Sequence, residues 1–346
     1  MATANQWPVD HPQARKYWAS DLFKELLKKT YAFRFMGTSD NSLCQVRNEL
    51  KGDGDRVRVS LRIQLSGAGV LGDNTQEGNE EDLTIYHDDL YINQLRHAVR
   101  STGKMSEQRI PYNVRALARD ALADWWADRF DYWFFNQLSG NTDETDTRYT
   151  GLQAAIAPEN ILEPRTSLTS TASMSTADIM SVKLIDWAIE KAKLRTYPMR
   201  PVKVGGKDYW VLFIHPYQET DLRRNFTAGE WGDIMRARLE GGEGTDNPIF
   251  SGAIGVYNNT VIHSTHRLPA PTTTTRRAIF CGAQAAAIAF GKGYSTGSKY
   301  DWNEEFFDYK NQLGVEAGTI AGLKKLQFNS VDFGSMVIPT YAIAHT

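Results

Sequence analysis

The chain has 346 residues, 41% of them hydrophobic and 23% charged, with a formal net charge of −2. This length allows a sizeable core in one elaborate domain or two, and the near-neutral charge argues against a dedicated nucleic-acid-binding protein. Two distant cysteines without a C-x-x-C motif, no apolar run near the roughly 20 residues that span a bilayer, and no signal-peptide pattern predict a soluble protein made in a reducing compartment.

Residues 1–50 form a predicted N-terminal arm. Within it, Arg15 to Thr30 has the spacing of a short amphipathic helix. The apolar residues on one side of this helix are Tyr17, Trp18, Leu22, Phe23, Leu26 and Leu27. So much aromatic surface must pack against the protein's own core or against a neighbouring chain.

A long two-stranded ribbon follows the arm. From Arg56 to Leu65 aliphatic and polar residues alternate strictly, which predicts a strand with one apolar and one polar face. A return strand is expected from Leu83 to Arg100. Its apolar face changes side along the way, and we attribute the change to a bulge near residues 87–89. A ribbon of this length is predicted to reach beyond its own core.

The tip of the ribbon, Ser66 to Asp82, is rich in glycine, asparagine and acid, and no Lys or Arg falls between Arg62 and Arg96. The acidic residues are Asp73, Glu77, Glu80, Glu81 and Asp82. Two interpretations are open. The loop is kept soluble by its charge, or it docks on a basic patch of a neighbouring subunit, where electrostatic complementarity sets register and specificity.

A helix is predicted from Asn113 to Leu138. Asn113 is a suitable N-cap, the apolar residues follow i, i+3, i+4 spacing, and Gly140 is a suitable stop. About 26 residues at about 1.5 Å each make a rod near 39 Å long. Since the mean helix of a globular protein has about 11–12 residues, we interpret this one as a structural spine.

The remaining chain is predicted to form an α/β lobe and two final strands. A helix is expected over 176–195, with Asp178 in its first turn, and the apolar run 209–214 predicts a buried strand. A second helix should begin near Tyr217. Further strands are expected over 254–263 and 278–290, and residues 229–248 form a Gly-rich loop. Residues 322–342 read as two apolar strands, broken at Gly334, that return to the long helix.

Several motifs that suggest chemistry have simpler explanations. Gly67 to Gly72 spells G-x-G-x-x-G, but no helix is expected after it and five acids would repel phosphate, so a tight turn is favoured. His263 and His266 would lie on opposite strand faces, which favours surface histidines over a metal pair. His215 with Asp221 is the one candidate catalytic pair, but without a G-x-S-x-G nucleophile a strand-end histidine is favoured.

An acidic stripe also runs along the predicted long helix. It consists of Asp120, Asp124, Asp128 and Asp131, opposed by Arg115, Arg119 and Arg129. Carboxylates at this spacing can bind metal, but no E-x-x-H partner is present, so a solvated face is the favoured interpretation. The sequence therefore predicts no catalytic, cofactor-binding or metal-binding residues.

A series of blocks, in order, resembles the major capsid proteins of tailed bacteriophages, specifically the N-four podophage type. The resemblance covers most of residues 45–345 and is strongest over 50–140. The blocks are Gly52–Asp55, Ser66–Val70, Glu77–Glu81, Gln94–Arg100 and Ala116–Trp126.

The resemblance implies an α+β protein with the Hong Kong-type (Johnson) capsid fold. The implied parts are an N-terminal arm (1–50), an extended E-loop ribbon (51–110), a spine helix of a peripheral domain (111–149), an axial domain (150–309), and C-terminal strands that return to the peripheral domain (310–346). Covalently crosslinked members join a lysine to an asparagine. Crosslinking through the ribbon tip is not expected here because no lysine lies between Lys51 and Lys104.

The implied function is a non-enzymatic major capsid protein that assembles into pentamers and hexamers of an icosahedral head around double-stranded DNA. Its location would be the virion, after assembly in the host cytoplasm. Implied partners are further copies of itself, a separate scaffolding protein, a portal and a decoration protein, with DNA met only non-specifically and no membrane or cofactor. Two alternatives stay open: a soluble enzyme with a site near His215, or a minor virion structural protein.

Overall fold

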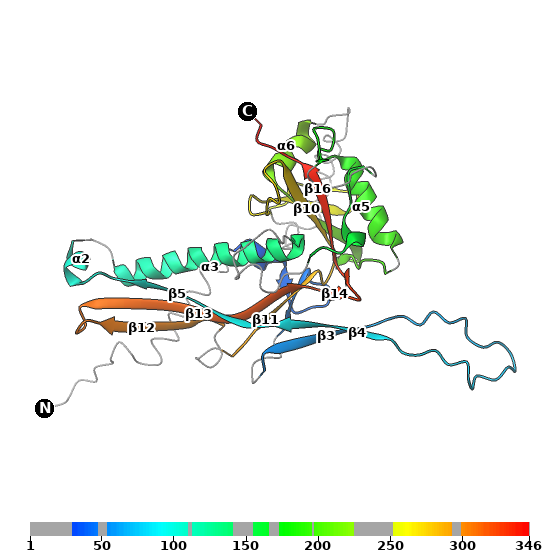
Figure 1. Cartoon of the computed structure of the whole chain (residues 1–346), viewed down its shortest axis with the longest axis horizontal. Coiled ribbons are helices and arrows are strands. Elements are labelled where there is room, and N and C mark those ends of the chain that lie inside the picture. The colour runs from blue at the N-terminus through cyan, green and yellow to red at the C-terminus, as the bar shows by residue number, and fades with distance from the viewer. Residues whose placement is uncertain are drawn as a thin grey trace.

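The computed structural model describes residues 30–47, 54–109, 113–140, 155–165, 173–195, 197–224, 252–292 and 299–345. The predicted helix over 15–30 and the Gly-rich loop over 229–248 lie outside these ranges. Two six-stranded sheets and one long helix build the molecule, and a ribbon extends from one end of it (Figure 1).

Sheet 1 lies beneath the long helix. Its central strand β13 pairs with β5, β11 and β12, all antiparallel, while β2 adds to β11 in parallel. The strands are β1 (Met36–Gly37), β2 (Cys44–Arg47), β5 (Asn93–Arg100), β11 (Ala286–Phe290), β12 (Asp301–Phe307) and β13 (Gln312–Lys325).

Sheet 2 forms the upper part of the molecule in Figure 1 and has the order β16-β10-β7-β9-β8, with β6 beside β7. The strands are β6 (Val202–Val204), β7 (Lys207–Ile214), β8 (Gly255–Tyr257), β9 (Thr260–Ser264), β10 (Thr275–Cys281) and β16 (Ser335–Tyr341). The remaining strands form two small pairs: β3 (Arg56–Arg62) with β4 (Ile85–Tyr91), and β14 (Gln327–Phe328) with β15 (Val331–Asp332).

The helices are η1 (Ala32–Phe35), α2 (Lys104–Gln108), α3 (Val114–Ser139), η3 (Pro158–Asn160), α5 (Val182–Leu194) and α6 (Pro216–Arg224). The long helix α3 confirms the prediction at both ends. The Asn113 side chain accepts from the amides of Arg115 and Ala116, and Gly140 ends the helix in the left-handed conformation at φ 56°. Glycine adopts this conformation without the steric penalty that a Cβ brings.

Two hydrophobic cores use opposite faces of sheet 2. Phe130 and Phe134 of α3 pack with Phe213 and Ile279, in a core that continues into sheet 1. Helix α5 packs with the alternate residues of the same strands, among them Leu212. Successive strand residues point to opposite faces, so one sheet is covered on both sides.

Helix α5 begins six residues later than predicted. Asp178, expected in its first turn, precedes the helix and is buried. Its carboxylate accepts from the amide of Ser175 at 2.9 Å and pairs with Arg165 at 3.1 Å. Asp178 therefore stabilises the segment that precedes the helix and does not interact with the N-terminus of the helix.

The chain crosses repeatedly between the two sheets. The predicted strand over 278–290 is two strands, β10 in sheet 2 and β11 in sheet 1. The two C-terminal strands also separate: β13 lies beneath α3, whereas β16 pairs with β10 from Thr275↔Tyr341 to Cys281↔Ser335. β16 is the edge strand of sheet 2, and this sheet also packs against α3, so both C-terminal strands lie near the long helix although they belong to different sheets.

The ribbon has no bulge where one was predicted. Its register runs without interruption from Arg56↔Tyr91 to Arg62↔Ile85. The sequence pattern suggests a change of face because Asp88 occupies an inward position and Ile85 an outward one. The real break is at Ile92, where β4 ends and β5 begins to pair with β13. There the backbones approach closely, since a Cβ at Gly322 would lie 1.9 Å from the Tyr91 carbonyl oxygen.

Candidate functional site

The inner face of the ribbon changes from buried to exposed along its length. Val57 and Val59 are buried, Leu61 and Ile63 are half-buried, and Leu65 is 55% exposed. The buried end packs against sheet 1 and the β14–β15 hairpin in a small core that contains Leu90, Ala287, Ala289, Leu326 and Phe328. The ribbon is thus anchored at β3 and β4, while the ribbon loop, residues 63–84, extends away from the body (Figure 1).

All five predicted acidic residues lie on the exposed ribbon loop. Two of them have partners within it. Glu81 accepts from the amides of Ser66 at 2.7 Å and Gly67 at 2.6 Å, which lowers its pKa, and Glu80 accepts from the amide of Gly78. No hydrogen bond joins the side chains of the other three to a described residue. These are Asp73, Glu77 and Asp82.

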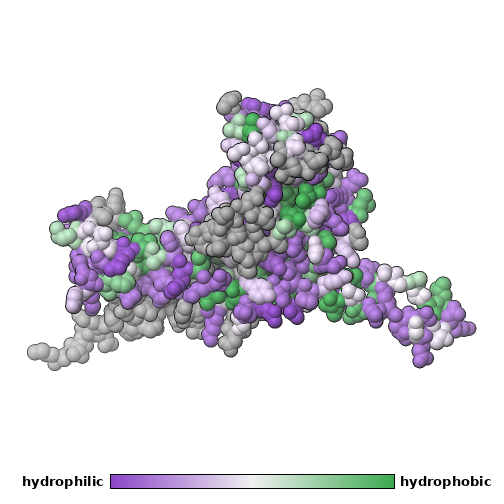
Figure 2. Space-filling view, viewed as in Figure 1, coloured by the Kyte–Doolittle hydropathy of each residue, from purple (hydrophilic) through white to green (hydrophobic). Residues whose placement is uncertain are grey.

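Large apolar residues accompany these acids. Leu71 is 81% exposed, and Leu65 and Leu83 are more than half exposed. Figure 2 shows hydrophobic and hydrophilic residues intermixed on the loop. Gly69 and Gly72 have positive φ values of 70° and 64°, and the chain after Gly72 continues in turns, as the tight-turn interpretation predicts.

The opposite end of the molecule carries exposed cations and apolar residues, together with the acids Glu107, Glu305 and Asp308. There α2 lies beside the turn between β12 and β13, because the amide of Lys104 donates to the Asn311 side chain at 3.2 Å. Within the described residues, the exposed cations of this end form no ion pair. We call this end the distal surface; its exposed cations are Lys104, Arg109 and Lys310, and its exposed apolar residues are Met105, Leu117 and Tyr309.

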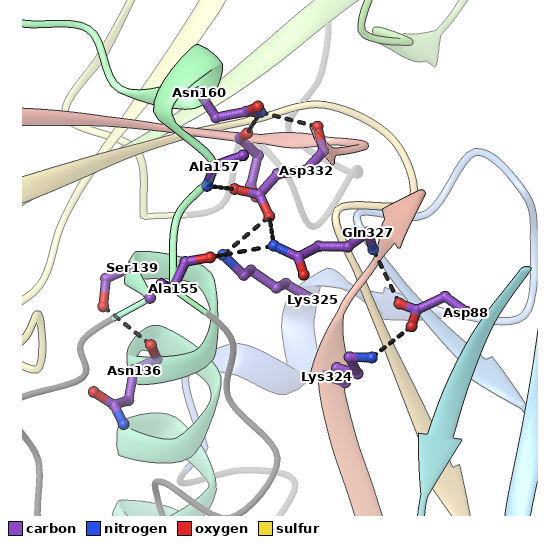
Figure 3. Close-up of polar contacts among 12 residues, drawn as sticks. Asp88, Asn136, Ser139, Ala155, Ala157, Asn160, Lys324, Lys325, Gln327 and Asp332 are labelled. Carbon is purple, nitrogen blue, oxygen red and sulfur yellow. Dashed lines mark hydrogen bonds and ion pairs between the residues drawn. The ribbon is translucent and has the colours of Figure 1, made fainter. Parts of the chain in front are cut away.

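A buried polar junction lies where the ribbon, sheet 1 and sheet 2 meet (Figure 3). Lys325 and Asp332 are fully buried and form an ion pair at 3.0 Å. Lys325 also donates to the Ala155 carbonyl at 2.8 Å, and desolvation lowers its pKa. The Asp332 carboxylate accepts further from the Gln327 side chain at 2.6 Å and the Ala157 amide at 3.1 Å. A buried pair of this kind is stable only because its remaining hydrogen-bonding capacity is used.

A second ion pair joins this junction to the ribbon. Asp88 of β4 pairs with Lys324 and accepts from the Gln327 amide at 3.0 Å. The adjacent Asp89 points to the other face of the ribbon, where it binds Arg58 through two hydrogen bonds of 2.8 and 3.0 Å. Neither ion pair was predicted from the sequence. The available signals were two lysines at the end of an apolar strand and an acid at an inward ribbon position.

The structure separates the histidines that the sequence analysis considered. His266 is exposed, but the prediction of a surface residue is wrong for His263, which is fully buried and bonds the Tyr31 hydroxyl at 2.9 Å. His215 is a satisfied strand-end histidine: its Nδ1 accepts from the Tyr217 amide, and burial lowers its pKa to about 4. Asp221 pairs with His345 at 3.1 Å, so the suggested catalytic pair is not assembled.

The acidic stripe of α3 is only partly solvated. Asp131 is fully buried, which corrects the prediction, and its carboxylate accepts from the amides of Tyr31 and Ala32 at the start of η1. Burial raises the pKa of Asp131, and Arg267 pairs with both Asp131 and Asp128. The described residues contain no cluster of three or more potential metal ligands. None of their helices has the length and hydrophobicity needed to span a bilayer.

Comparison with known proteins decides the family. A model of the family described as phage capsid protein matches residues 6–344. The chain belongs to this family. The capsid protein of Ralstonia phage GP4 is 36% identical, and the match covers 99% of this chain and 100% of that one, with a TM-score of 0.83. The major capsid protein of Pseudomonas phage KPP25 is 28% identical over 96% of each chain.

More distant structures share the fold of this capsid protein. The capsid protein of cyanophage Pam1 is 18% identical, with a TM-score of 0.72, and the match covers 100% of this chain and 97% of that one. The predicted α+β Hong Kong-type capsid fold is confirmed. The predicted function is also confirmed: the chain is a major capsid protein of a tailed phage, and an enzyme with a site near His215 is not favoured.

Proposed function

We propose that this major capsid protein assembles through its ribbon into pentamers and hexamers of a tailed-phage head around double-stranded DNA. One observation carries the proposal. The ribbon is built into its own core at β3 and β4, yet its loop presents exposed leucines and three acids without a hydrogen-bond partner among the described residues, at a distance from that core. Exposed apolar side chains grouped in this way mark a protein interaction site.

The two ends of the molecule are suited to a head-to-tail contact. The ribbon loop is at one end and the distal surface at the other (Figure 1). A contact between different surfaces of identical subunits generates a ring when its rotation closes. Loops of this kind would then link each subunit to the next around a pentamer or hexamer.

Charge and hydrophobicity match across this contact. Asp73, Glu77 and Asp82 would face Lys104, Arg109 and Lys310, which accounts for register and rapid association. The exposed leucines of the loop would pack against Met105, Leu117 and Tyr309, and removal of their apolar area from water supplies affinity. The docked-loop interpretation of the acidic residues is therefore the one that we propose, with Glu80 and Glu81 shaping the loop.

The proposal also includes the partners that the resemblance implies. A separate scaffolding protein would direct closure in the host cytoplasm, and a portal and a decoration protein would join the shell. Contact with DNA would be non-specific, consistent with a net charge of −2. The subunit would carry out no chemistry on a substrate.

Charge reversal tests the contact. We expect the D73K/E77K/D82K variant and the K104E/R109E/K310E variant each to stay folded but to lose closed particles in sedimentation and negative-stain microscopy. A chain that carries both sets should recover particles, because the charges are complementary again. Reversal of two exposed acids elsewhere, E190K/D208K, is the control. Normal particles from either triple variant, or no recovery in the combined chain, would reject this contact.

A further inference from the structure

Two consecutive lysines at the end of β13 bind in opposite directions. Lys324 reaches Asp88 in the ribbon, and Lys325 reaches Asp332 in β15 (Figure 3). Opposite directions are expected of neighbouring strand residues. One short stretch of sheet 1 therefore holds the ribbon on one face and the crossing to sheet 2 on the other.

Gln327 connects the two ion pairs. Its backbone amide donates to Asp88, and its side-chain amide donates to Asp332 at 2.6 Å. Asn160 continues the contacts, since its side chain donates to the carbonyls of Asp332 and Ser335 at 2.9 and 2.6 Å. Ser335 begins β16, so hydrogen bonds run without a gap from the ribbon to sheet 2.

The polar contacts can fix the direction of the ribbon, which the apolar anchor cannot. Burial of Val57, Val59 and Leu90 holds the ribbon against the body, but the hydrophobic effect has no direction. The Asp88 carboxylate accepts one charge-assisted hydrogen bond from Lys324 and one from the backbone amide of Gln327, and both bonds have strict geometry. Its side chain is only 10% exposed and that of Lys324 19%, so water competes little for the pair. Among the described residues, the hydrogen bonds from β3 and β4 to the rest of the chain come from Lys324 and Gln327.

We propose that Asp88 and Lys324 are positioning residues that set the direction in which the ribbon leaves the body, and that Gln327 relates this direction to sheet 2. The inference rests on the proposed function only for its effect on assembly. The pair itself acts within one subunit. Loss of the pair leaves the ribbon attached through its apolar face but free to take other directions.

The test compares two neighbouring acids. D88N removes the charge that binds Lys324, whereas the control D89N removes a charge that binds Arg58 within the ribbon. Spin labels at L71C and L194C, both exposed positions, report the direction of the ribbon in dilute, unassembled subunits. The native cysteines, Cys44 and Cys281, are buried.

We expect D88N and K324M to broaden the distance distribution between the labels, because loss of a charge-assisted hydrogen bond lowers the ratio of fixed to displaced ribbon about tenfold. D89N should leave the distribution narrow. K324R should also keep it narrow, because the positive charge that pairs with Asp88 is retained. An unchanged distribution in D88N overturns the inference. Closed-particle yield is measured separately: a broadened distribution with full yield supports the positioning role and rejects ribbon docking as the basis of assembly.

Discussion

The two halves of the ribbon have the same alternating sequence pattern but different surroundings. In β3, Val57 and Val59 are buried against the protein's own sheet. Beyond Ile63 the alternation continues to Leu65, which is exposed and outside the hydrophobic cores of the described residues. The comparison shows that a period-2 pattern specifies which side chains share a face, while the neighbouring elements decide whether that face is covered by the same chain.

The junction beside the anchored half and the ribbon loop also differ in their polar contacts. In the junction, Lys325 and Asp332 are fully buried and multiply hydrogen-bonded. In the ribbon loop, Glu81 accepts hydrogen bonds from the amides of Ser66 and Gly67 and from the Ser66 hydroxyl, and its side chain is exposed to water. Subunit stability should therefore depend on the anchored half, and assembly on the loop.

The largest effect is expected from removal of the buried lysine. K325M leaves Asp332 as a buried charge without its cation, which should lower the free energy of unfolding of the unassembled subunit by about 3–5 kcal/mol. Arg58, in an exposed pair with Asp89, is the matched control, and R58M should cost far less because water screens the pair. Urea denaturation measures both. Equal losses in the two variants would contradict the assignment of stability to the junction.

A pair of leucines sharpens the comparison without charge. Leu90 is 1% exposed in the anchor, and L90A should lower the free energy of unfolding by about 2–5 kcal/mol through lost burial and the cavity left behind. Leu71 is exposed in the loop, and L71A should change it by no more than about 0.5 kcal/mol. Denaturant titration of both subunits, followed by a particle count for L71A, separates folding from assembly. The idea fails if L71A unfolds as readily as L90A.

The smallest effect concerns acid and the ribbon loop. The amides of Ser66 and Gly67 lower the pKa of Glu81, so the contact favours the ionised carboxylate. A lowered folded-state pKa means that this stabilisation is present above the ordinary glutamate pKa and is lost as pH falls below about 4.3 through the lowered value. In selectively labelled protein, the Gly67 amide resonance should move over this range, and E81Q should abolish the movement. A midpoint at or above the ordinary pKa would argue against the contact.

The sequence predicts elements whose determinants are local. Asn113 and Gly140 mark the ends of α3 correctly because caps act through neighbouring amides and carbonyls. The buried strand β7 and the start of α6 also follow from local pattern, and Ser66 to Asp82 is correctly placed on an exposed loop. Which strand belongs to which sheet could not be predicted from local pattern. Strands β10 and β11, for example, form one apolar run in the sequence, but the chain passes from sheet 2 to sheet 1 after Cys281.

The buried polar residues could not be predicted because their partners are distant in sequence. Asp131 lies within an acidic stripe of α3, and only the approach of Tyr31 and Ala32 reveals why it is buried. Asp88 reads as part of a bulge because its partner, Lys324, is 236 residues away. Sequence periodicity records burial of apolar side chains, whereas a paired buried charge looks the same as an exposed one until the fold brings the pair together.

The close approach at Gly322 has a mechanical consequence. No side chain separates the backbone of Gly322 from that of Tyr91, so the ribbon crosses sheet 1 at a closely packed point. A rotation about that point hardly moves the atoms beside it, but the displacement grows in proportion to the distance along the arm. A slight local adjustment at Gly322 would thus be amplified at the ribbon loop, with little disturbance of the subunit's interior.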